Sequence, residues 1–175
     1  MFTDPVKNLK QFGLKEDMIV ADLGAGTGFY SIPAAQMVLK GKVYAIEVQD
    51  DFLGIIRNKV KDAGLDNLNC ILGDIEKIGG TKIGDGIVDA VIVSNIISQV
   101  KDQDKFVEEI GRILKNRGRV LLIDWSEESP LINSKLKTVI TKDKALKIFE
   151  SKGFIFERDI NTEVHHYGMI LIKEK

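Results

Sequence analysis

The sequence has little of what disulfide-bonded, thiolate-metal or nucleic-acid-binding proteins need. Its 175 residues include one cysteine, Cys70, which excludes a disulfide framework and a metal site built from several thiolates. Basic and acidic residues nearly balance, 25 against 26, so the strongly positive charge typical of nucleic-acid-binding domains is absent. We therefore expect neither a nucleic-acid partner nor a metal site.

Long apolar runs are absent as well. No stretch of about 18 apolar residues occurs, so no membrane span is predicted. Residues 1–15 mix charged and polar side chains and do not form an apolar export signal. With one thiol and no such signal, we predict a cytoplasmic protein without a membrane partner. The length and the 44% hydrophobic content are those of one globular domain, residues 1–175.

Strand-like apolar runs alternate with segments of helical spacing along the chain. Asp4 followed by Pro5 is typical of a helix N-terminus, and Thr141 is a second candidate cap. Strands are predicted at residues 18–23, 42–47, 68–72, 89–93 and 119–124, and helices at 4–12, 29–39, 50–63, 105–114 and 141–152. Strands joined by helical, right-handed crossovers form a parallel sheet with helices on both faces. The predicted fold class is therefore α/β and doubly wound.

The C-terminal segment has a different pattern. Two strand-like runs, residues 154–160 and 163–172, are separated only by Asn161 and Thr162. Because a two-residue link permits only an antiparallel hairpin, one strand of the sheet is predicted to run against the others.

The clearest functional signal is a glycine-rich bend, VADLGAGTG, at residues 20–28. Gly24, Gly26 and Gly28 permit a tight turn and the close approach of a ligand to bare backbone. The helix that follows adds free N–H donors and a positive dipole end. Asp22 precedes the first of these glycines. The combination of strand, bend and helix favours a bound nucleoside over a simple structural turn.

An acidic residue accompanies the bend. Glu47 ends the second predicted strand, nineteen residues after Gly28, where a carboxylate can accept hydrogen bonds from both ribose hydroxyls. The G-x-G-x-G spacing departs from the G-x-G-x-x-G of dinucleotide sites, and Phe29 takes the last expected glycine position. Asp22 would repel a diphosphate but suits a ligand with a cationic amine or sulfonium. A nicotinamide-dependent oxidoreductase is therefore a disfavoured alternative.

These motifs resemble those of class I S-adenosylmethionine-dependent methyltransferases, especially small stand-alone domains related to the ubiquinone/menaquinone C-methyltransferases. The resemblance covers nearly the whole chain and includes VYAIE (43–47), GDIEKI (73–78), DAVIVSN (89–95) and LKNRGRVLLID (114–124). It implies a mostly parallel seven-stranded sheet of order 3-2-1-4-5-7-6 with strand 7 antiparallel. It also implies S-adenosyl-L-methionine as the cofactor.

The resemblance further implies which residues contact the cofactor. The three glycines of the bend would pack against its methionine and ribose, with Glu47 on the ribose diol and Val48 on the adenine. The other implied contacts are Asp74 and Ile75 on the base, and Ser94 and Asn95 beside the methionyl amine and the transferred methyl.

Candidates for the acceptor side follow from the expected topology. Ligands of doubly wound sheets bind beyond the carboxyl ends of the strands, here at the switch between the first and fourth strands. Asp124, after the fifth strand, is the best-placed carboxylate for base or orienting work, although it could equally be a turn residue. Trp125 could stack on an aromatic acceptor or belong to the core. Further polar candidates after the fourth strand are Asn95, Ser98 and Gln99.

Two residues of the last strand complete the catalytic candidates. Small related domains carry a similar His-Tyr-Gly, which directs attention to His166 and Tyr167. Strand alternation would place His165 and Tyr167 on one face and His166 on the other. One histidine could act as a base near neutral pH, and the alternative is a half-buried structural histidine.

The predicted function is S-adenosylmethionine-dependent methyl transfer to a small-molecule acceptor. A sulfonium activates its own methyl group, so holding the reactants in line supplies much of the acceleration and no catalytic triad is required. The alternative is a non-catalytic module that binds S-adenosylmethionine or S-adenosylhomocysteine.

The expected organisation leaves the acceptor site thinly walled. Residues 1–16 form an N-terminal cap helix, 17–125 the cofactor-binding core, and 126–175 a substrate-side loop, the last helix and the closing hairpin. Because only residues 4–12, 126–140 and the strand ends can wall the acceptor site, we expect it to be open or completed by a second subunit, as in a homodimer.

Overall fold

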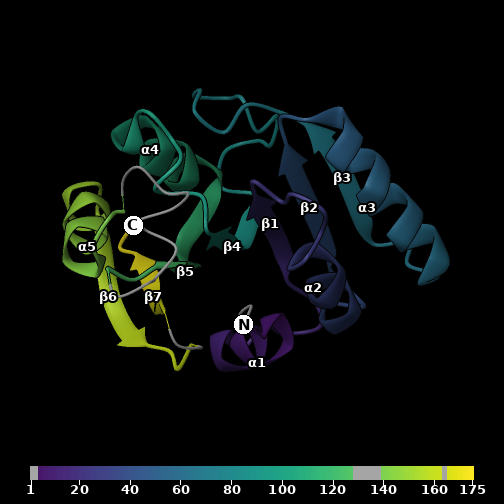
Figure 1. Ribbon diagram of the computed structural model, residues 1–175, viewed down its shortest axis with the longest axis horizontal. Coiled ribbons are helices and arrows are strands. Elements are labelled where there is room, and N and C mark those ends of the chain that lie inside the picture. Colours follow the sequence, from purple (N-terminus) through teal and green to yellow (C-terminus); the bar gives the residue numbers. More distant parts are fainter. Residues whose placement is uncertain (1–3, 128–138, 163–164) are drawn as a thin grey trace.

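One sheet organises the chain, with strand order β3-β2-β1-β4-β5-β7-β6 (Figure 1). The computed structural model describes residues 4–127, 139–162 and 165–175. The first five strands pair in parallel, and β7 is antiparallel to both β5 and β6. The strands are β1 (Ile19–Leu23), β2 (Lys42–Glu47), β3 (Leu68–Leu72), β4 (Val88–Ser94), β5 (Leu114–Trp125), β6 (Phe154–Asp159) and β7 (His166–Lys173). The predicted fold class, strand order and orientation are confirmed.

The helices begin and end where local chemistry dictates. Asp4 caps the first helix by accepting a hydrogen bond from the Lys7 N–H, Pro5 takes the first helical position, and Gly13 ends it at φ +76°. Thr141 caps the last helix in the same way through the Lys144 N–H. The helices are α1 (Pro5–Phe12), α2 (Ser31–Met37), α3 (Asp50–Asp62), α4 (Gln103–Ile113) and α5 (Lys142–Ser151).

Two apolar layers hold helices to opposite faces of the sheet, as Figure 1 shows for α4 and α5 against α2 and α3. Alternation along β1 separates the layers: Val20 packs in the α1–α2–α3 layer and Ala21 in the α4–α5 layer. Strands with both faces covered are apolar throughout, which explains the near-continuous runs in the sequence. No helix among the described residues is both long and apolar enough to cross a membrane.

Most predicted boundaries agree with the structure to within two residues, and two differences have a clear local cause. The helix predicted at 29–39 is shorter, because Gly28 at φ +82° keeps the chain in a turn until Tyr30. The fifth strand begins at Leu114, which was predicted to end a helix. Leu114 is fully buried and pairs with Val88 ahead of a bulge, so the chain joins the sheet directly from α4.

The predicted two-residue hairpin link is wrong. β6 ends at Asp159 and β7 begins only at His166, and His165 just before it has φ +82°, outside the β region. The prediction that His165 shares a face with Tyr167 within the strand is therefore wrong too. Residues 163 and 164, predicted to start the strand, lie outside the described residues.

The topology opens a site at the carboxyl edge of the sheet. Leu23, the last residue of β1, pairs with Ile46 of β2 on one side and Val93 of β4 on the other. The connections after β1 and β4 diverge to opposite faces, so the glycine bend emerges at the switch point, between Glu47 and Ser94.

Candidate active site

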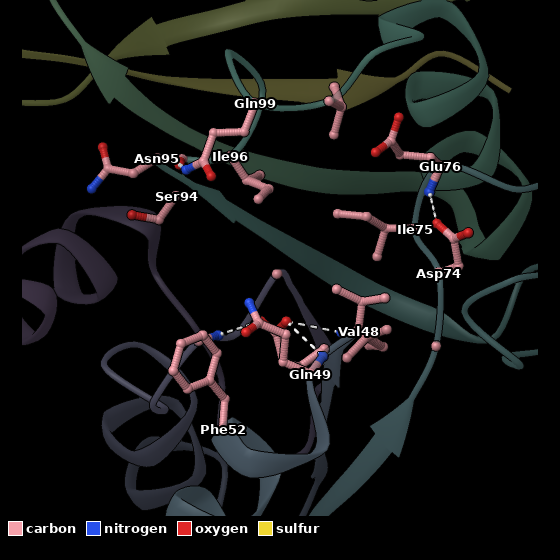
Figure 2. A pocket seen from close by; sticks show the side chains of 16 residues that line it. Val48, Gln49, Phe52, Asp74, Ile75, Glu76, Ser94, Asn95, Ile96 and Gln99 are labelled. Atoms are coloured by element: carbon pink, nitrogen blue, oxygen red, sulfur yellow. Dashed lines mark hydrogen bonds between the residues drawn. The ribbon is translucent and has the colours of Figure 1, made fainter. Parts of the chain in front are cut away.

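A cavity of about 460 Å³ lies at this switch point (Figure 2). Its volume falls in the range of about 300–1,000 Å³ usual for small-molecule sites. The walls come from the carboxyl ends of β2 and β4 and from the segments that follow the first four strands. The lining residues are Gly24, Gly26, Ile46, Glu47, Val48, Gln49, Phe52, Gly73, Asp74, Ile75, Glu76, Ser94, Asn95, Ile96, Gln99 and Val100. Eight of the ten predicted cofactor contacts are therefore brought together around one space.

Two glycines of the bend shape the floor of the cavity. The N–H of Gly24 donates to the Ile46 carbonyl at 2.9 Å, and a Cβ at position 24 would lie 2.9 Å from the Ile96 side chain. A Cβ on Gly26 would meet no heavy atom within 4 Å. Both have positive φ, +71° and +53°. Glycine at 24 therefore permits close packing against the opposite wall, and glycine at 26 leaves bare backbone facing open space.

Glu47 lines the cavity and is held in place by backbone donors. Its Oε2 accepts from the Gly26 N–H at 2.9 Å, and its Oε1 accepts from the N–H groups of Val48 at 2.9 Å and Gln49 at 3.1 Å. A carboxylate has about four acceptor positions, so these three bonds leave capacity for a ligand. The side chain is oriented before any ligand arrives.

The two ends of the cavity differ in chemistry. Val48 and Ile75 lie near Asp74 at one end, and Ser94, Asn95 and Gln99 lie at the other (Figure 2). One end therefore offers two apolar side chains and the Asp74 carboxylate, which suit a flat base with an amino group, and the other end is polar and suits an amino-acid group.

The polar end contains an unpaired buried acceptor. The Oδ1 of Asn95 is buried without a hydrogen-bond partner in the described part of the chain, and its backbone has φ +55°. The N–H of Asn95 donates to the Ile123 carbonyl at 2.8 Å, and Gln99 Nε2 donates to the Asn95 carbonyl at 2.5 Å. Since an unpaired buried acceptor is costly, this amide is suited to an ammonium or hydroxyl donor of a ligand.

The carboxylate of Asp74 is shaped by its own loop. Hydrogen bonding to Lys77, at 2.9 Å, and to the Glu76 N–H, at 3.1 Å, lowers the pKa of Asp74. The group is therefore an ionised acceptor at neutral pH. It would bind a ligand amino group and repel a carbonyl oxygen.

Two predicted cofactor contacts do not line the cavity. Gly28 instead packs against α2 and α3. A Cβ at this position would lie 3.1 Å from the Ile56 side chain and 3.5 Å from that of Ile32. Asp22 is 3% exposed and accepts from the Ser31 hydroxyl at 2.5 Å. Burial raises the pKa of Asp22 to about 6, with hydrogen bonds from Ser31 opposing the shift. Asp22 thus contributes a buried charge beneath the bend.

This raised pKa predicts a pH-dependent stability. The folded state keeps the Asp22 proton up to about pH 6, whereas the unfolded chain releases it near pH 4, so stability falls as pH rises through that window. About two pKa units correspond to roughly 2–3 kcal/mol. The unmodified protein should therefore lose about that much free energy of unfolding between pH 4 and pH 7, whereas Asp22→Asn should not. Urea titrations of both proteins at the two pH values measure this difference. Parallel pH profiles would contradict the assignment.

The sheet divides the three catalytic candidates between its faces. Residues directly opposed in an antiparallel pair share a face. Asp124 opposes Tyr167, whose ring packs in the α4–α5 layer, and Trp125 opposes His166 on the other face. The Trp125 and His166 rings stack with centroids 4.0 Å apart. The three candidates reach the same edge of the sheet from different sides.

Asp124 holds the turn after β4. Its carboxylate is fully buried and accepts from the Ser98 hydroxyl at 3.2 Å, the Ser98 N–H at 3.4 Å and the Trp125 N–H at 2.7 Å. Burial raises the pKa of Asp124. Because the same turn carries Gln99, which lines the large cavity, Asp124 fixes one of the cavity walls from within β5.

His166 and Tyr167 keep unpaired polar atoms. Both imidazole nitrogens of His166 and the Tyr167 hydroxyl are buried without a hydrogen-bond partner in the residues described. Burial lowers the pKa of His166, with a contribution from His165, and burial together with the charge of Asp124 raises the pKa of Tyr167. Both are neutral at pH 7. They line a smaller cavity of about 250 Å³ with Lys142, Asp159, Ile160, Asn161, Thr162 and Gly168.

Several cavity residues were not predicted from the sequence. They are Ile46, Gln49, Phe52, Gly73, Glu76, Ile96 and Val100. Gln99 was expected only on the acceptor side. All but Phe52 directly adjoin residues that were predicted, so the signal was the carboxyl edge itself: every residue at or just after the end of a strand there is a candidate. Across residues 4–127, 139–162 and 165–175, no group of three or more His, Cys, Asp or Glu side chains is placed to hold a metal ion.

Fold and cavity together define a class of protein. A doubly wound sheet with a glycine bend at the switch point and an acid at the tip of the neighbouring strand is a nucleoside-binding α/β domain. The N–H of Gly26 is already bonded to the Glu47 carboxylate, which would repel a diphosphate, and the opposite end of the cavity is lined by the amides of Asn95 and Gln99. Comparison with known proteins narrows this class.

Residues 14–153 match the family model described as a methyltransferase domain, and the chain belongs to that family. A crystal structure of an S-adenosylmethionine-dependent methyltransferase from Aquifex aeolicus is 32% identical, with a TM-score of 0.87 over 97% of this chain and 89% of that one. The sequence-based assignment to the S-adenosylmethionine-dependent methyltransferases, with that cofactor, is confirmed at the level of the family.

Curated relatives share the core but are longer. The ubiquinone/menaquinone biosynthesis C-methyltransferase UbiE of Haemophilus ducreyi is 28% identical over 117 residues, which are 66% of this chain and 44% of that protein. The UbiE protein of Pasteurella multocida is 29% identical over 66% of this chain and 42% of its own length. The chain thus spans under half the length of these relatives.

Proposed function

We propose that this domain binds S-adenosylmethionine in the 460 Å³ cavity and transfers its methyl group to a small-molecule acceptor at the carboxyl edge of β4 and β5. The observation that carries the proposal is Glu47, held by backbone N–H groups directly beside the open face of Gly26. An acid between an apolar end and an amide end matches a ribose between a base and an amino-acid arm.

The residues fit that ligand along its length. The adenine would lie between Val48 and Ile75, with its amino group on Asp74. The ribose diol would bind Glu47. The methionyl ammonium would donate to the unpaired Oδ1 of Asn95, which supplies the one buried acceptor at that end without a partner among the described residues. Ser94 follows β4 at the same end.

When bound, the sulfonium supplies an electrophilic methyl carbon. The contribution of the protein is to hold the acceptor in line with that carbon and to exclude water, which can supply much of the acceleration. Tyr167 and His166, neutral and buried at the sheet edge, would hydrogen-bond the acceptor, and the imidazole would take its proton if it carries one. Asp124, through Ser98, would keep the turn between cofactor and acceptor in place.

Binding and turnover test the proposal separately. In isothermal titration calorimetry the protein should bind S-adenosylmethionine and S-adenosylhomocysteine, and should bind NADH more weakly than either. Release of S-adenosylhomocysteine should rise with at least one acceptor from panels of phenols, amines and acidic carbon compounds. Binding without release on any acceptor would favour the non-catalytic module, and tighter binding of NADH would favour an oxidoreductase.

The acceptor side has its own test. Tyr167→Phe removes one buried hydroxyl, so with the acceptor found above kcat/KM for that acceptor is expected to fall roughly tenfold, while the Kd of S-adenosylhomocysteine stays unchanged. Tyr44→Phe, on β2, is the matched control and should change neither value. An equal loss in both variants would remove Tyr167 from the proposed acceptor site.

The remaining expectations about organisation stay predictions. They are the division at residues 1–16, 17–125 and 126–175, a cytoplasmic location, no nucleic-acid or membrane partner, and a homodimer. The predicted acceptor-side loop, residues 126–140, lies mostly outside the described residues. Mass in solution with and without S-adenosylhomocysteine tests the homodimer.

A further inference from the structure

A fully buried glutamate lies behind one wall of the cavity. Glu109, on α4, is 0% exposed. Its Oε2 accepts from the Gly79 N–H at 2.8 Å, and its Oε1 accepts from the Thr81 hydroxyl at 2.6 Å and from the Thr81 N–H at 3.2 Å. All three donors belong to the loop between β3 and β4, residues 73–87. We call it the base loop, because Asp74 and Ile75 near its start are the proposed contacts of the adenine base.

Arg112 extends this attachment. It donates to Glu109 from Nε and Nη2, both at 2.8 Å, and from Nη2 to the Ile83 carbonyl at 2.8 Å. Its Nη1 forms an ion pair with Asp85 at 2.5 Å. Two side chains one helical turn apart thus fasten four positions of the base loop to α4.

The attachment points are tied tightly to the residues that line the cavity. The N–H of Asp74 donates to the Gly80 carbonyl at 3.1 Å, and the Gly80 N–H donates to the Lys77 carbonyl at 2.8 Å. A Cβ on Gly80 would lie 2.0 Å from the Asp74 carbonyl oxygen, and one on Gly73 would lie 2.6 Å from that of Gly80. With no room between these backbones, a displacement of residues 79–81 moves Asp74.

The segment before α4 contacts the same loop from the other side. The Lys101 N–H donates to Glu76 Oε2 at 2.8 Å, and Gln99 and Val100 just before it line the cavity. Both walls at the base end therefore depend on α4 and its N-terminal connection.

We propose that Glu109 and Arg112 are positioning residues that set the base selectivity of the cavity by fixing the base loop. The inference rests on the proposed function, since it concerns the same cavity. A buried ion pair is seldom retained for stability alone, because apolar residues of similar volume can stabilise as well. Here the carboxylate is needed because it pairs three loop donors that apolar side chains would leave unsatisfied.

Selectivity is the property that distinguishes positioning from general support. The ionised Asp74 accepts from a purine amino group and repels a carbonyl oxygen in its place, and this discrimination depends on where Asp74 lies. A loosened base loop lets the carboxylate move away, which weakens the favourable contact and relieves the unfavourable one. A general destabilisation of the fold would instead weaken the binding of both ligands by the same factor.

The test compares two ligands by calorimetry: S-adenosylhomocysteine and S-inosylhomocysteine, in which a carbonyl oxygen replaces the purine amino group. The unmodified protein should prefer the first by at least about tenfold, the size of one hydrogen bond to a charged group. In Glu109→Gln, the affinity for S-adenosylhomocysteine should fall roughly tenfold and the preference should approach unity. Glu108→Gln, which removes the neighbouring exposed carboxylate paired with Lys152, is the matched control and should keep both values.

A second variant protects the test against misfolding. Thr81→Val removes one hydroxyl bonded to Glu109 while preserving side-chain shape, and it should reduce the preference in the same direction by a smaller factor. Undiminished preference in Thr81→Val, and in Glu109→Gln if that variant folds, would overturn the inference alone. Failure of the unmodified protein to bind S-adenosylhomocysteine would overturn the proposed function and this inference with it.

Discussion

Glu47→Ala is expected to weaken S-adenosylhomocysteine binding by at least about a hundredfold. A hydrogen bond to a charged group contributes about 1.5–3 kcal/mol, and the ribose diol offers two donors to this carboxylate. Removing the side chain also frees the N–H groups of Gly26, Val48 and Gln49, which line a cavity that water can enter. The loss should therefore appear mainly in ligand affinity, measured by calorimetry.

Asp89→Ala provides the matched control. Asp89 is also a carboxylate at a strand end, and it accepts from the Ile19 N–H at 2.8 Å and from Lys115 Nζ at 2.7 Å. It lies at the amino end of β4, the opposite edge of the sheet from the cavity. The control should lose thermal stability but keep its Kd. If Glu47→Ala and the unmodified protein bound S-adenosylhomocysteine with equal affinity, Glu47 would not bind the ribose of the ligand and the assignment would be wrong.

The sequence was sufficient for the sheet and for placing eight of the ten predicted cofactor residues around one cavity. Buried parallel strands read as continuous apolar runs, glycine and capping residues mark where helices stop and start, and both are local signals. The contacts near Glu47 follow because the bend and the second strand each carry a recognisable pattern. The predicted element boundaries were wrong near residues whose backbone is irregular. Positive φ angles occur at Gly28, Arg117 and His165, and the spacing of hydrophobic residues does not reveal them.

The roles of buried polar groups were not predictable in the same way. Asp22 and Asp124 both lie near the carboxyl ends of strands, where acids often contact ligands. In the structure, however, each accepts a hydrogen bond from a serine hydroxyl, Ser31 and Ser98 respectively. Glu109 gave no signal at all, since a glutamate within an amphipathic helix is ordinarily assigned to its exposed face. Whether a carboxylate meets ligand or protein depends on distant loops that only the folded chain brings together.

A common arrangement links these acids. Glu47 fixes the glycine bend, Glu109 the base loop, and Asp124 the turn after β4. Each is at most 7% exposed and accepts from backbone N–H groups of the segment it holds. The backbone N–H groups of loops at the edge of a sheet have no neighbouring strand to bond with. Buried carboxylates accept hydrogen bonds from these N–H groups and so hold the loops in place. Three buried carboxylates thus hold the loops around the cavity in place, and Glu47 also lines the cavity itself.

Gly26→Val is expected to abolish measurable S-adenosylhomocysteine binding, a loss of at least about a hundredfold, because the new methyl groups would project into the space reserved for the ligand. In the free protein no heavy atom lies within 4 Å of a Cβ at this position, so we expect the fold to accommodate valine apart from backbone strain at φ +53°. That strain costs on the order of 1–3 kcal/mol. The backbone N–H that donates to Glu47 remains, so this variant is independent of Glu47→Ala.

Gly64→Val separates strain from obstruction. Gly64 follows α3 with φ +63° and also has no heavy atom within 4 Å of a Cβ, but it does not line the cavity. The two variants should lose similar free energies of unfolding in urea, and only Gly26→Val should lose the ligand. If both retained affinity, the open face of Gly26 would not be where the cofactor lies. If both lost it equally, strain rather than obstruction would explain the effect, since a bend at residue 64 has no ligand to exclude.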